Sequence, residues 1–500
     1  MKLRGDKMIT ATHEGKYYDV EYSIVNISEL EGESRIDAEY YDPFYLRNES
    51  EITKKKWCHI RDLLSKVQYG LSLAMNEERI GYKILKMDDI IGILADDSNC
   101  KYVDIDSKTF LRFKLEKGDV LFNRVNSEEF VGRTGIYLLD GKHTFASYLI
   151  RIRAKNYFTN FYITIYLNTK YGKISLKRVM RRAVNQANIN AEELKSLKIP
   201  IPSDTFQKFI EKLVLKAYEE RQKAEQFYKQ AEEILLEELG LKNWKPKTKK
   251  IKIGGQEFKE EENISIRTLS NVIKADRMDA EYWEPKYDEI EELVKNYKYS
   301  WNYLPNLVNI SKRKIKINNE EVYNYIELAD INQNLGAVNQ TKQIRGRDLP
   351  SRARMKVEKG YVIMSSVEGS IDKIALIDFE KDNSLASTGF FVFKEDDLNK
   401  ETLLVLLKIL AKRYLIREAQ GTILTAIPYD SLERIILPKI NQQIQQKIAY
   451  LIQQSFEARE NSKKLLEIAQ RIVEIYIEKN EEEGLNYAKD KLKELRIEIN

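Results

Sequence analysis

The sequence predicts a mixed α/β protein with an internal duplication, in which two α/β units are separated by two long antiparallel coiled-coil helices. Two observations carry this prediction. Short motifs recur in the same order about 240 residues apart, and each copy ends in a long apolar heptad pattern. A chain of 500 residues also exceeds one ordinary hydrophobic core, so at least two domains are expected.

The heptad pattern of the first copy runs from Phe206 to Ile234 in steps of four and three, which only a helix places on one stripe. At about 1.5 Å per residue, a helix from Phe206 to Leu239 spans roughly 50 Å. The predicted contact positions are Phe206, Ile210, Leu213, Ala217, Ala224, Phe227 and Ala231 in the first helix and Ile444, Ile448, Leu451, Ser455, Ser462, Leu465 and Ala469 in the second. Small residues recur at matching places, so we expect the helices to pair; two unrelated surface helices are the alternative. Asp204 and Asn441 are predicted N-caps.

The repeat is visible in the motifs themselves. Arg35 to Pro43 reappears as Arg277 to Pro285, and Lys117 to Val120 reappears as Lys359 to Val362, both at an offset of 242 (277 minus 35, 359 minus 117). Lys117 to Val120 predicts a turn into a buried strand, with Gly135 to Leu139 as its hairpin partner. Each copy therefore has the same plan, which is a globular unit, a proline and a long helix.

These patterns divide the chain into six predicted segments. They are a first globular unit 1–202 that begins with a polar arm 1–22, a first long helix 203–242, a basic linker 243–262, a second globular unit 263–438, a second long helix 439–480 and a charged tail 481–500. The tail is compatible with one more short helix. Prolines before each long helix end the preceding strand and set the direction of the helix.

The composition excludes several classes of function. Two cysteines form no disulfide framework, and three histidines leave little for a metal site. No signal peptide and no apolar run of membrane-spanning length is present, so we expect a cytoplasmic protein. No phosphate-binding Gly-rich loop, no dinucleotide fingerprint and no Asn/Asp-Pro-Pro-Tyr adenine pocket of amino-methyltransferases occurs. We therefore expect a non-catalytic chain without a cofactor or metal of its own.

Basic and amide side chains gather in predicted loops beside the strands of both copies. Arginine can bind guanine or phosphate, and Asn and Gln can pair with adenine in the major groove. The candidate DNA contacts of the first copy are Ser72, Lys86, Arg124, Asn126, Arg133, Arg178, Arg181, Arg182, Gln186 and Asn188. Those of the second copy are Lys312, Arg313, Lys314, Arg345, Arg347, Arg352, Ser366, Glu368, Arg417 and Thr422. For each residue alone, a solvated surface charge is an equal alternative.

The two copies differ most at these positions, because Arg124 to Asn126 is matched by Ser366 to Glu368. Scaffold positions agree while candidate contacts do not, as expected if one scaffold recognises two different DNA sequences. Two units separated by a rod tens of ångströms long also suit two half-sites about one DNA turn apart, roughly 34–36 Å. The net charge of +5 neither requires nor excludes DNA binding, so the basic surface must be local.

On these residues the chain resembles the specificity subunits of type I restriction–modification systems. The resemblance rests on the strand Gly118 to Arg124, on Ala146-Ser147, on Ile199 to Pro202 before the first long helix, and on Leu437-Pro438 before the second. It implies two target recognition domains, each recognising one half of a split DNA target, and two antiparallel helices that space them. It also implies double-stranded DNA, two methyltransferase subunits and a translocating restriction subunit as partners, with S-adenosylmethionine, ATP and Mg held by those partners.

Two alternatives remain open at this point. One is a recognition subunit of a related methyltransferase–nuclease defence system, which neighbouring genes would distinguish. The other is a coiled-coil scaffold that joins two protein-binding domains and does not bind DNA. Steeply salt-dependent DNA binding by the assembled complex would exclude the scaffold. A stand-alone enzyme is disfavoured by the missing motifs.

Overall fold

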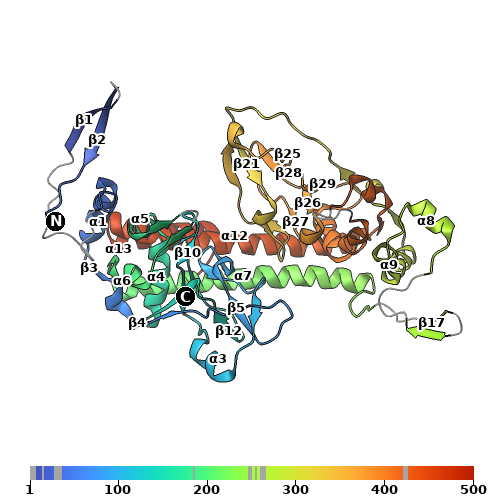
Figure 1. The fold of residues 1–500 in the computed structure, drawn as a ribbon, viewed down its shortest axis with the longest axis horizontal. Helices are drawn as coiled ribbons and strands as arrows, with labels where there is room; N and C mark the ends of the chain where they lie inside the picture. Colours follow the sequence, from blue (N-terminus) through green and yellow to red (C-terminus); the bar gives the residue numbers. More distant parts are fainter. Residues whose placement is uncertain are drawn as a thin grey trace. The chain divides into compact units, whose positions relative to one another are not determined.

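The computed structural model divides the chain into two compact units, one made of Met1–Glu220 with Glu460–Asn500 and the other of Arg221–Arg459 (Figure 1). The structure describes residues 7–13, 16–26, 37–183, 186–245, 250–253, 256–259, 266–419 and 426–499. Two long helices, α7 (Asp204–Glu238) and α12 (Gln442–Glu478), each contribute one half to either unit. The mixed α/β fold with long linker helices is therefore as predicted.

Unit 1 is built on a six-stranded sheet whose buried face is covered by helix α4. The strand order is β4 (Leu64–Tyr69), β13 (Leu149–Ala154), β9 (Val120–Asn123), β11 (Thr134–Ile136), β7 (Leu94–Ala95) and β6 (Ile90–Ile91). Strands β9 and β11 pair antiparallel, which confirms the predicted hairpin. A smaller sheet has the order β12 (His143–Phe145), β5 (Tyr82–Leu85) and β8 (Lys101–Val103).

Helices and short strands surround these two sheets. They are β1 (Lys7–His13), β2 (Lys16–Tyr22), α1 (Pro43–Thr53), β3 (Trp57–His59), α2 (Ile60–Leu63), α3 (Ser107–Phe113), β10 (Val125–Asn126), α4 (Tyr157–Asn168), α5 (Lys170–Val179), β14 (Arg181–Ala183), β15 (Gln186–Asn188), α6 (Ala191–Ser196), β16 (Lys198–Pro200) and α13 (Glu481–Leu495). Helix α4 is buried on almost every side because it lies between the large sheet and the long helices. The tail prediction of a further helix is met by α13.

Unit 2 repeats the large sheet strand for strand. Its order is β20 (Asn309–Ile310), β29 (Phe390–Lys394), β26 (Val362–Ser365), β27 (Ile374–Leu376), β23 (Ala337–Val338) and β22 (Ile331–Asn332). The smaller sheet has four strands, β24 (Lys342–Arg345), β21 (Val322–Ile326), β28 (Ser384–Ser387) and β25 (Ala353–Lys356), one more than in unit 1. The remaining elements are β17 (Lys250–Ile253), β18 (Gln256–Lys259), α8 (Leu269–Ala275), α9 (Pro285–Lys295), β19 (Trp301–Tyr303), α10 (Lys400–Leu406), a π-helical turn (Leu407–Ala411), α11 (Lys412–Leu415) and β30 (Ile436–Pro438).

The duplication extends to individual hydrogen bonds. The amide of Gly118 donates to the carbonyl of Tyr137 at 2.8 Å, and the amide of Gly360 donates to the carbonyl of Ile377 at 2.8 Å. The two glycines have φ of 94° and 91°, a left-handed conformation that favours glycine. The repeated Lys-Gly pair is therefore fixed by the turn that leads into β9 and β26.

A buried ion pair explains one difference between the copies. Asp119 is 1% exposed and lies 3.5 Å from Arg151 and 2.7 Å from Arg153. At the equivalent places of unit 2, Tyr361 replaces the aspartate and the fully buried Val392 replaces Arg151. A buried charge without its partner is costly, so Asp119 and the buried Arg151 are replaced together in unit 2.

Helices α7 and α12 pair through their small residues. The Ser455 hydroxyl donates to the Ala224 carbonyl at 2.7 Å within unit 2, and the Ser462 hydroxyl donates to the Ala217 carbonyl at 2.7 Å within unit 1. Ala217 contacts Ser462, and Ala224, seven residues later on α7, contacts Ser455, seven residues earlier on α12. The two helices are therefore antiparallel. A serine hydroxyl can donate to a carbonyl of the facing helix only when the two helices lie close together, and the small alanine and serine side chains allow this.

Two details of these helices differ from the prediction. Three of the predicted contact positions, Phe227, Ile444 and Leu451, are only half-buried. Tyr228, the neighbour of Phe227, is buried instead at 2% exposure, because it faces the globular part of unit 2. The cap of α7 is Ser203, whose hydroxyl accepts from the Phe206 amide at 3.2 Å, so Asp204 is the first helical residue. Asn441 does cap α12, since its side chain accepts from the Gln443 amide at 2.8 Å.

Candidate nucleic-acid interface

A small three-stranded ribbon in unit 1 carries several candidate DNA contacts. Strand β15 lies between β10 and β14, with Val125 opposite Asn188 and Asn126 opposite Ala187. Side chains alternate across a strand, so the buried Ala187 anchors the ribbon while Gln186 and Asn188 emerge on its other side. The ribbon therefore presents amide side chains toward solvent from a fixed backbone.

Arg124 lies at the base of this ribbon and is held by three contacts. Its amide donates to the Tyr148 carbonyl at 3.0 Å, and its Nε donates to the Ser147 carbonyl at 3.0 Å. The guanidinium carbon lies 5.1 Å from the centre of the Tyr69 ring, a cation–π distance. The terminal guanidinium nitrogens make no hydrogen bond to a residue that the structure describes, so they are available to a base edge or a phosphate.

Arg181 and Arg182 extend from β14 and are paired with carboxylates. Arg181 is 61% exposed and pairs with Glu193, and Arg182 pairs with Glu39 and Glu128. The two glutamates beside Arg182 are exposed, whereas Glu193 is only 12% exposed. An exposed ion pair contributes little stability, about 0–1 kcal/mol, so a DNA phosphate could take the place of the carboxylates beside Arg182. Both arginines therefore remain candidates for the DNA backbone.

Two other predicted contacts of unit 1, Ser72 and Lys86, are placed differently from each other. Ser72 is exposed, next to the bridge that joins Leu71 to Ala146. Lys86 is mostly buried and lies 3.3 Å from Asp89, which holds the turn before β6. Ser72 is therefore accessible to a ligand, whereas Lys86 is engaged in an ion pair with Asp89.

Arg133 holds a loop in place. Its Nη1 donates to the Ile90 carbonyl at 3.2 Å, and burial lowers the pKa of its guanidinium, which stays charged. In unit 2 the Lys373 ammonium donates to the Ile331 carbonyl at 3.3 Å, in the same place of the fold. A contact kept in both copies supports a structural role for Arg133.

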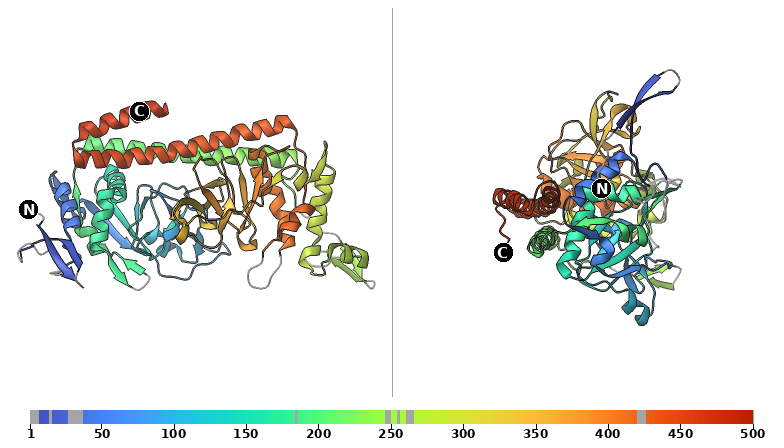
Figure 2. Two further views of the ribbon diagram at one scale, coloured as in Figure 1. Left: turned by 90° about the horizontal axis from the view of Figure 1, so that it is seen from above. Right: turned by 90° about the vertical axis from the view of Figure 1, so that its left-hand side faces the viewer.

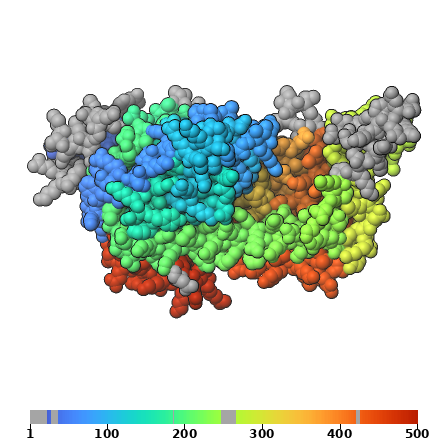
Figure 3. All heavy atoms as spheres, turned by 90° about the horizontal axis from the view of Figure 1, so that it is seen from below, coloured from blue at the N-terminus to red at the C-terminus, as the bar shows by residue number. Residues whose placement is uncertain are grey.

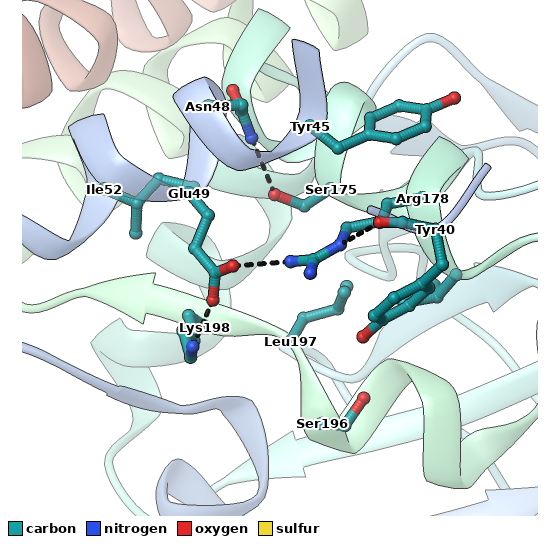
Figure 4. A pocket seen from close by; sticks show the side chains of 11 residues that line it. Tyr40, Tyr45, Asn48, Glu49, Ile52, Ser175, Arg178, Ser196, Leu197 and Lys198 are labelled. Carbon is teal, nitrogen blue, oxygen red and sulfur yellow. Dashed lines mark hydrogen bonds and ion pairs between the residues drawn. The ribbon is translucent and has the colours of Figure 1, made fainter. Parts of the chain in front are cut away.

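Arg178 is not available to DNA, which corrects its prediction as a contact. Its Nη1 donates to Glu49 at 2.6 Å, its Nε donates to the Tyr40 carbonyl at 2.9 Å, and its side chain is 9% exposed (Figure 4). Burial alone would raise the pKa of Glu49, but Arg178 and Lys198 together hold it below its usual value. The adjoining cavity of about 30 Å³ has room for little more than one water molecule.

Arg417 repeats this arrangement in unit 2 and is corrected for the same reason. It donates to Glu291 at 2.7 Å, lies 5.2 Å from the Tyr282 ring and has a side-chain exposure of 9%. Both arginines fasten the repeated Asp-Ala-Glu-Tyr segment to the helix that follows the large sheet. The sequence shows the charge of both arginines but not the distant glutamate that neutralises each of them.

In unit 2 a basic segment lies along the edge of the smaller sheet. Lys314 bridges to Met355 of β25, and the Ile315 amide donates to the Arg354 carbonyl at 3.0 Å. Ile315 and Ile317 pack on the small core beneath the sheet, which leaves the basic side chains outward. The exposed residues of this segment and of the turn before β25 are Lys312, Arg313, Lys314 and Arg352.

Arg345 and Arg347 lie at the opposite edge of the same sheet, where β24 ends. Both are exposed, and Arg347 approaches Asp348 only at 3.8 Å. Arg345 makes no ion pair with a residue that the structure describes. Thr422 falls outside the described part of the chain.

The position of Arg124 is taken by Ser366 in unit 2. The Ser366 amide donates to the Gly389 carbonyl at 2.8 Å, as the Arg124 amide does to Tyr148, and its hydroxyl donates to the same carbonyl at 3.0 Å. Glu368 is half-buried and begins a short 3-10 helix. The same backbone therefore presents a long cation in one unit and a short hydroxyl in the other.

Sequence reasoning missed three residues beside these sites. Lys316 is exposed next to Lys314, and the alternating Lys-Ile-Lys-Ile pattern from 314 to 317 is the strand signal that would have revealed it. Tyr69 and Tyr148 are 42% and 41% exposed beside Arg124 and offer rings for stacking. Aromatic residues are common in this chain, so their sequence positions gave no signal.

Two further observations bear on the chemistry. Across the part of the chain that the structure describes, no three His, Cys, Asp or Glu side chains come together to hold a metal ion. No described helix is both long and apolar enough to cross a membrane.

Comparison with known proteins gives a consistent picture. Residues 64–230 match the family described as "Type I restriction modification DNA specificity domain". The chain is 35% identical over 160 residues to the "Putative type I restriction enzyme MjaX specificity subunit" of Methanocaldococcus jannaschii, which is 31% of this chain and 37% of that protein. It is 26% identical over 150 residues to the "Type I restriction enzyme EcoKI specificity subunit" of Escherichia coli K12, which is 29% of this chain and 32% of that protein. The chain thus spans about a third of the length of these relatives.

Among solved structures, an S subunit of a type I restriction–modification system from M. genitalium shares 14% identity and a TM-score of 0.38, over 85% of this chain and 95% of that one. An HsdS subunit from Thermoanaerobacter tengcongensis shares 13% identity and a TM-score of 0.26, over 85% and 97%. These values are too low to carry an argument. The sequence matches nevertheless confirm the resemblance to type I specificity subunits that the motifs indicated.

Proposed function

We propose that this chain, whose residues 64–230 match the type I restriction–modification DNA specificity domain family, is the non-catalytic DNA-recognition subunit of such a system. One observation carries the proposal. The amides of Arg124 and Ser366 make equivalent backbone hydrogen bonds in the two units, to the Tyr148 carbonyl at 3.0 Å and to the Gly389 carbonyl at 2.8 Å. Their side chains nevertheless offer DNA entirely different groups, a guanidinium and a hydroxyl. A duplicated scaffold with exchanged side chains suits two different DNA sequences.

In this proposal each unit recognises one half of a bipartite target. The ribbon residues of unit 1 and the basic segment of unit 2 contact DNA, and the paired helices α7 and α12 set the distance between the half-sites. The recognition domains correspond to 1–202 and 263–438, joined by helices 203–242 and 439–480 with the linker 243–262 between the copies and a tail 481–500. Arginine and amide side chains at exposed strand ends support base contacts, and exposed lysines support phosphate contacts.

The partners in this proposal are double-stranded DNA, two methyltransferase subunits and one restriction subunit. Catalysis and its cofactors, S-adenosylmethionine, ATP and Mg, belong to those subunits. The relatives named above are specificity subunits of restriction enzymes, which supports assembly with other subunits.

The experiment is to map methylated motifs in host DNA with this gene present and deleted. We expect one split motif, two short defined stretches separated by unspecified bases, that disappears on deletion. A deletion that leaves every motif in place, or that removes a continuous motif, would contradict the proposal. Arg124→Ala in the same host tests the site directly and should alter one half of the motif. The control is Lys463→Ala, a substitution at an exposed position of α12, which should alter neither half.

A further inference from the structure

The ends of the sheet strands occupy equivalent places in the two units. In unit 1 the sheets lie on one side of its long-helix segments and α13 lies on the other, and in unit 2 the sheets likewise lie on one side of its own segments (Figure 2). Figure 3 shows the blue segments of unit 1, which precede α3, at the surface. Since the large sheet repeats strand for strand, a ligand at the strand ends of one unit meets equivalent positions in the other.

Unit 1 holds Arg124 over a tyrosine ring. Tyr69, the last residue of β4, lies opposite Ile150 of β13, and its ring centre is 5.1 Å from the guanidinium carbon of Arg124. The Tyr69 hydroxyl accepts a hydrogen bond of 3.0 Å from the amide of Ala191, the first residue of α6. The ring is therefore fixed by its own strand and by α6, and it restricts where the guanidinium can lie.

The residue at the Arg124 position of unit 2 cannot take over this role. The Ile189 amide donates to the Arg124 carbonyl at 2.9 Å. The Ile427 amide donates to the Ser366 carbonyl at 2.8 Å in the same way, so the two positions are equivalent. The Ser366 hydroxyl donates to the Gly389 carbonyl at 3.0 Å, and a hydroxyl has a single hydrogen to donate. Ser366 therefore offers a ligand neither a cation nor a free donor.

Unit 2 nevertheless contains a cation held over a tyrosine ring. The ammonium nitrogen of Lys312 lies 5.2 Å from the centre of the Tyr429 ring. That ring packs edge-on against the fully buried Phe391, with the ring centres 4.9 Å apart and the planes at 87°. Lys312 is exposed and makes no hydrogen bond or ion pair with a residue that the structure describes. Its ammonium group is therefore held in place and open to a ligand.

Lys312 occupies in unit 2 the position that Tyr69 occupies in unit 1. It continues the chain two residues beyond Ile310 of β20 and comes opposite Phe391 of β29. Tyr69 lies opposite Ile150, which is the equivalent residue of β13. The cation of unit 2 therefore comes from the position that carries the ring in unit 1.

Tyr429 in turn occupies the position of Ala191. Ala191 lies two residues after Ile189, and Tyr429 lies two residues after Ile427, the equivalent isoleucine. Tyr429 begins a short 3-10 helix where Ala191 begins α6. Each unit thus holds one cation on one tyrosine where the same three elements meet, but different elements supply the cation and the ring.

We propose that Lys312 is the cation of unit 2 that recognises a base, as Arg124 is in unit 1, and that Tyr69 and Tyr429 are the residues that position these two cations. The inference rests on the proposed DNA recognition. The group bound is the O6 and N7 edge of a guanine in the major groove, which arginine and lysine both recognise by donating hydrogen bonds.

Two features favour a base edge over a phosphate. Phosphates are the same in every DNA sequence, so a cation that binds only phosphate has no need to change position between two equivalent units. A ring beneath the cation also restricts its direction, which matters for the two acceptors of a guanine edge. The cation that starts from a different strand in each unit suits two half-sites with different sequences.

The test maps methylated motifs in a host that carries the complete system with variants of this chain. Lys312→Ala should make one G·C pair in one half of the motif tolerant of other bases, with roughly a tenfold or greater loss of discrimination in methylation rate. The other half should be unchanged, and Lys312→Arg should keep the guanine. The matched control is Lys359→Ala, at an exposed lysine of the same unit, which should alter neither half.

Variants of the two tyrosines test the positioning role. Tyr429→Leu should relax the same base pair as Lys312→Ala, whereas Tyr429→Phe, which keeps the ring, should not. Tyr69→Leu should relax the base pair that Arg124→Ala relaxes, in the other half of the motif. A variant that only destabilised the fold would lower methylation of the whole motif without changing its sequence, and that result for both leucine variants would overturn the positioning role.

A guanine analogue distinguishes a base contact from a phosphate contact. The assembled complex should bind a duplex with 7-deazaguanine at the relaxed position more weakly, because this base lacks the N7 acceptor, and Lys312→Ala should then add little further loss. Weaker binding of every duplex by Lys312→Ala with an unchanged motif, or relaxation of an A·T pair, would overturn the guanine contact.

The failure of this inference differs from the failure of the proposed function. A split motif that depends on this gene but is unaffected by Lys312→Ala would overturn the role of Lys312 alone. A motif that does not depend on this gene would overturn the proposed DNA recognition, and the role of Lys312 with it.

Discussion

The hydroxyl of Ser455 donates a 2.7 Å hydrogen bond to the backbone carbonyl of Ala224 on the facing long helix, and both residues are fully buried. A contact from a side chain to the opposite backbone requires the helices to be unusually close. The seam is therefore intolerant of larger side chains at either position.

Ala224→Trp should destabilise the helix pair, because a large side chain cannot fit where a serine reaches the backbone. Overpacking of this kind costs about 1–3 kcal/mol and sometimes more. Thermal or urea unfolding measures the effect. Lys223→Trp is the matched control at the neighbouring exposed position and should change stability little; equal losses at both sites would refute the seam.

Arg178→Ala should destabilise unit 1 without a specific effect on recognition. Removal of Arg178 leaves the buried Glu49 with Lys198 as its remaining cation and the Tyr40 carbonyl without its donor. Complete loss of a buried partner costs about 3–5 kcal/mol, so we expect a smaller loss here. Arg124→Ala should leave unfolding nearly unchanged, because the Arg124 side chain is only half-buried, and should instead weaken DNA binding by the assembled complex. The opposite pattern, a stable Arg178 variant with lost recognition, would restore Arg178 as a DNA contact.

These two arginines show what the sequence could and could not predict. Heptad spacing, the repeated motifs and the β9–β11 hairpin depend on local patterns, and they were predicted correctly. The partner of Arg178 lies 129 residues away and becomes its neighbour only in the folded chain. Phe227 and Tyr228 fit the apolar pattern equally well, and the choice between them depends on the globular part of unit 2.

Acidification should selectively weaken the contact between α1 and α5. Arg178 and Lys198 lower the pKa of Glu49 in the folded chain despite burial, so the stabilisation by its ionised form is fully present above the unfolded value of about 4.5. It is lost as the pH falls from there through the folded pKa. Urea unfolding between pH 7 and pH 3.5 measures this slope, and Glu49→Gln should flatten it. An unchanged slope in that variant would contradict the role of Glu49.

A fragment of residues 1–242 should form an antiparallel homodimer, because Ala217 and Ala224 place small residues at both close contacts of the seam. Its globular part should be held less firmly than in the full chain. In the full chain Lys170 lies 2.7 Å from Glu478 on α12. In the homodimer a second copy of α7 takes the place of α12, and its equivalent residue, Gly240, cannot form this ion pair. Analytical ultracentrifugation tests the pairing, and a monomer at tens of micromolar would show that the two helices are complementary but not interchangeable.

The most direct test of the central claim is to exchange residues 1–202 for the corresponding segment of a related specificity subunit and to map the methylated motif in the host. If each unit recognises one half of a split target, one half of the motif should change while the other half keeps its sequence. Sequencing that detects modified bases across the genome gives this result in one measurement. A motif that changes in both halves, or in neither, would contradict the assignment of one half-site to each unit.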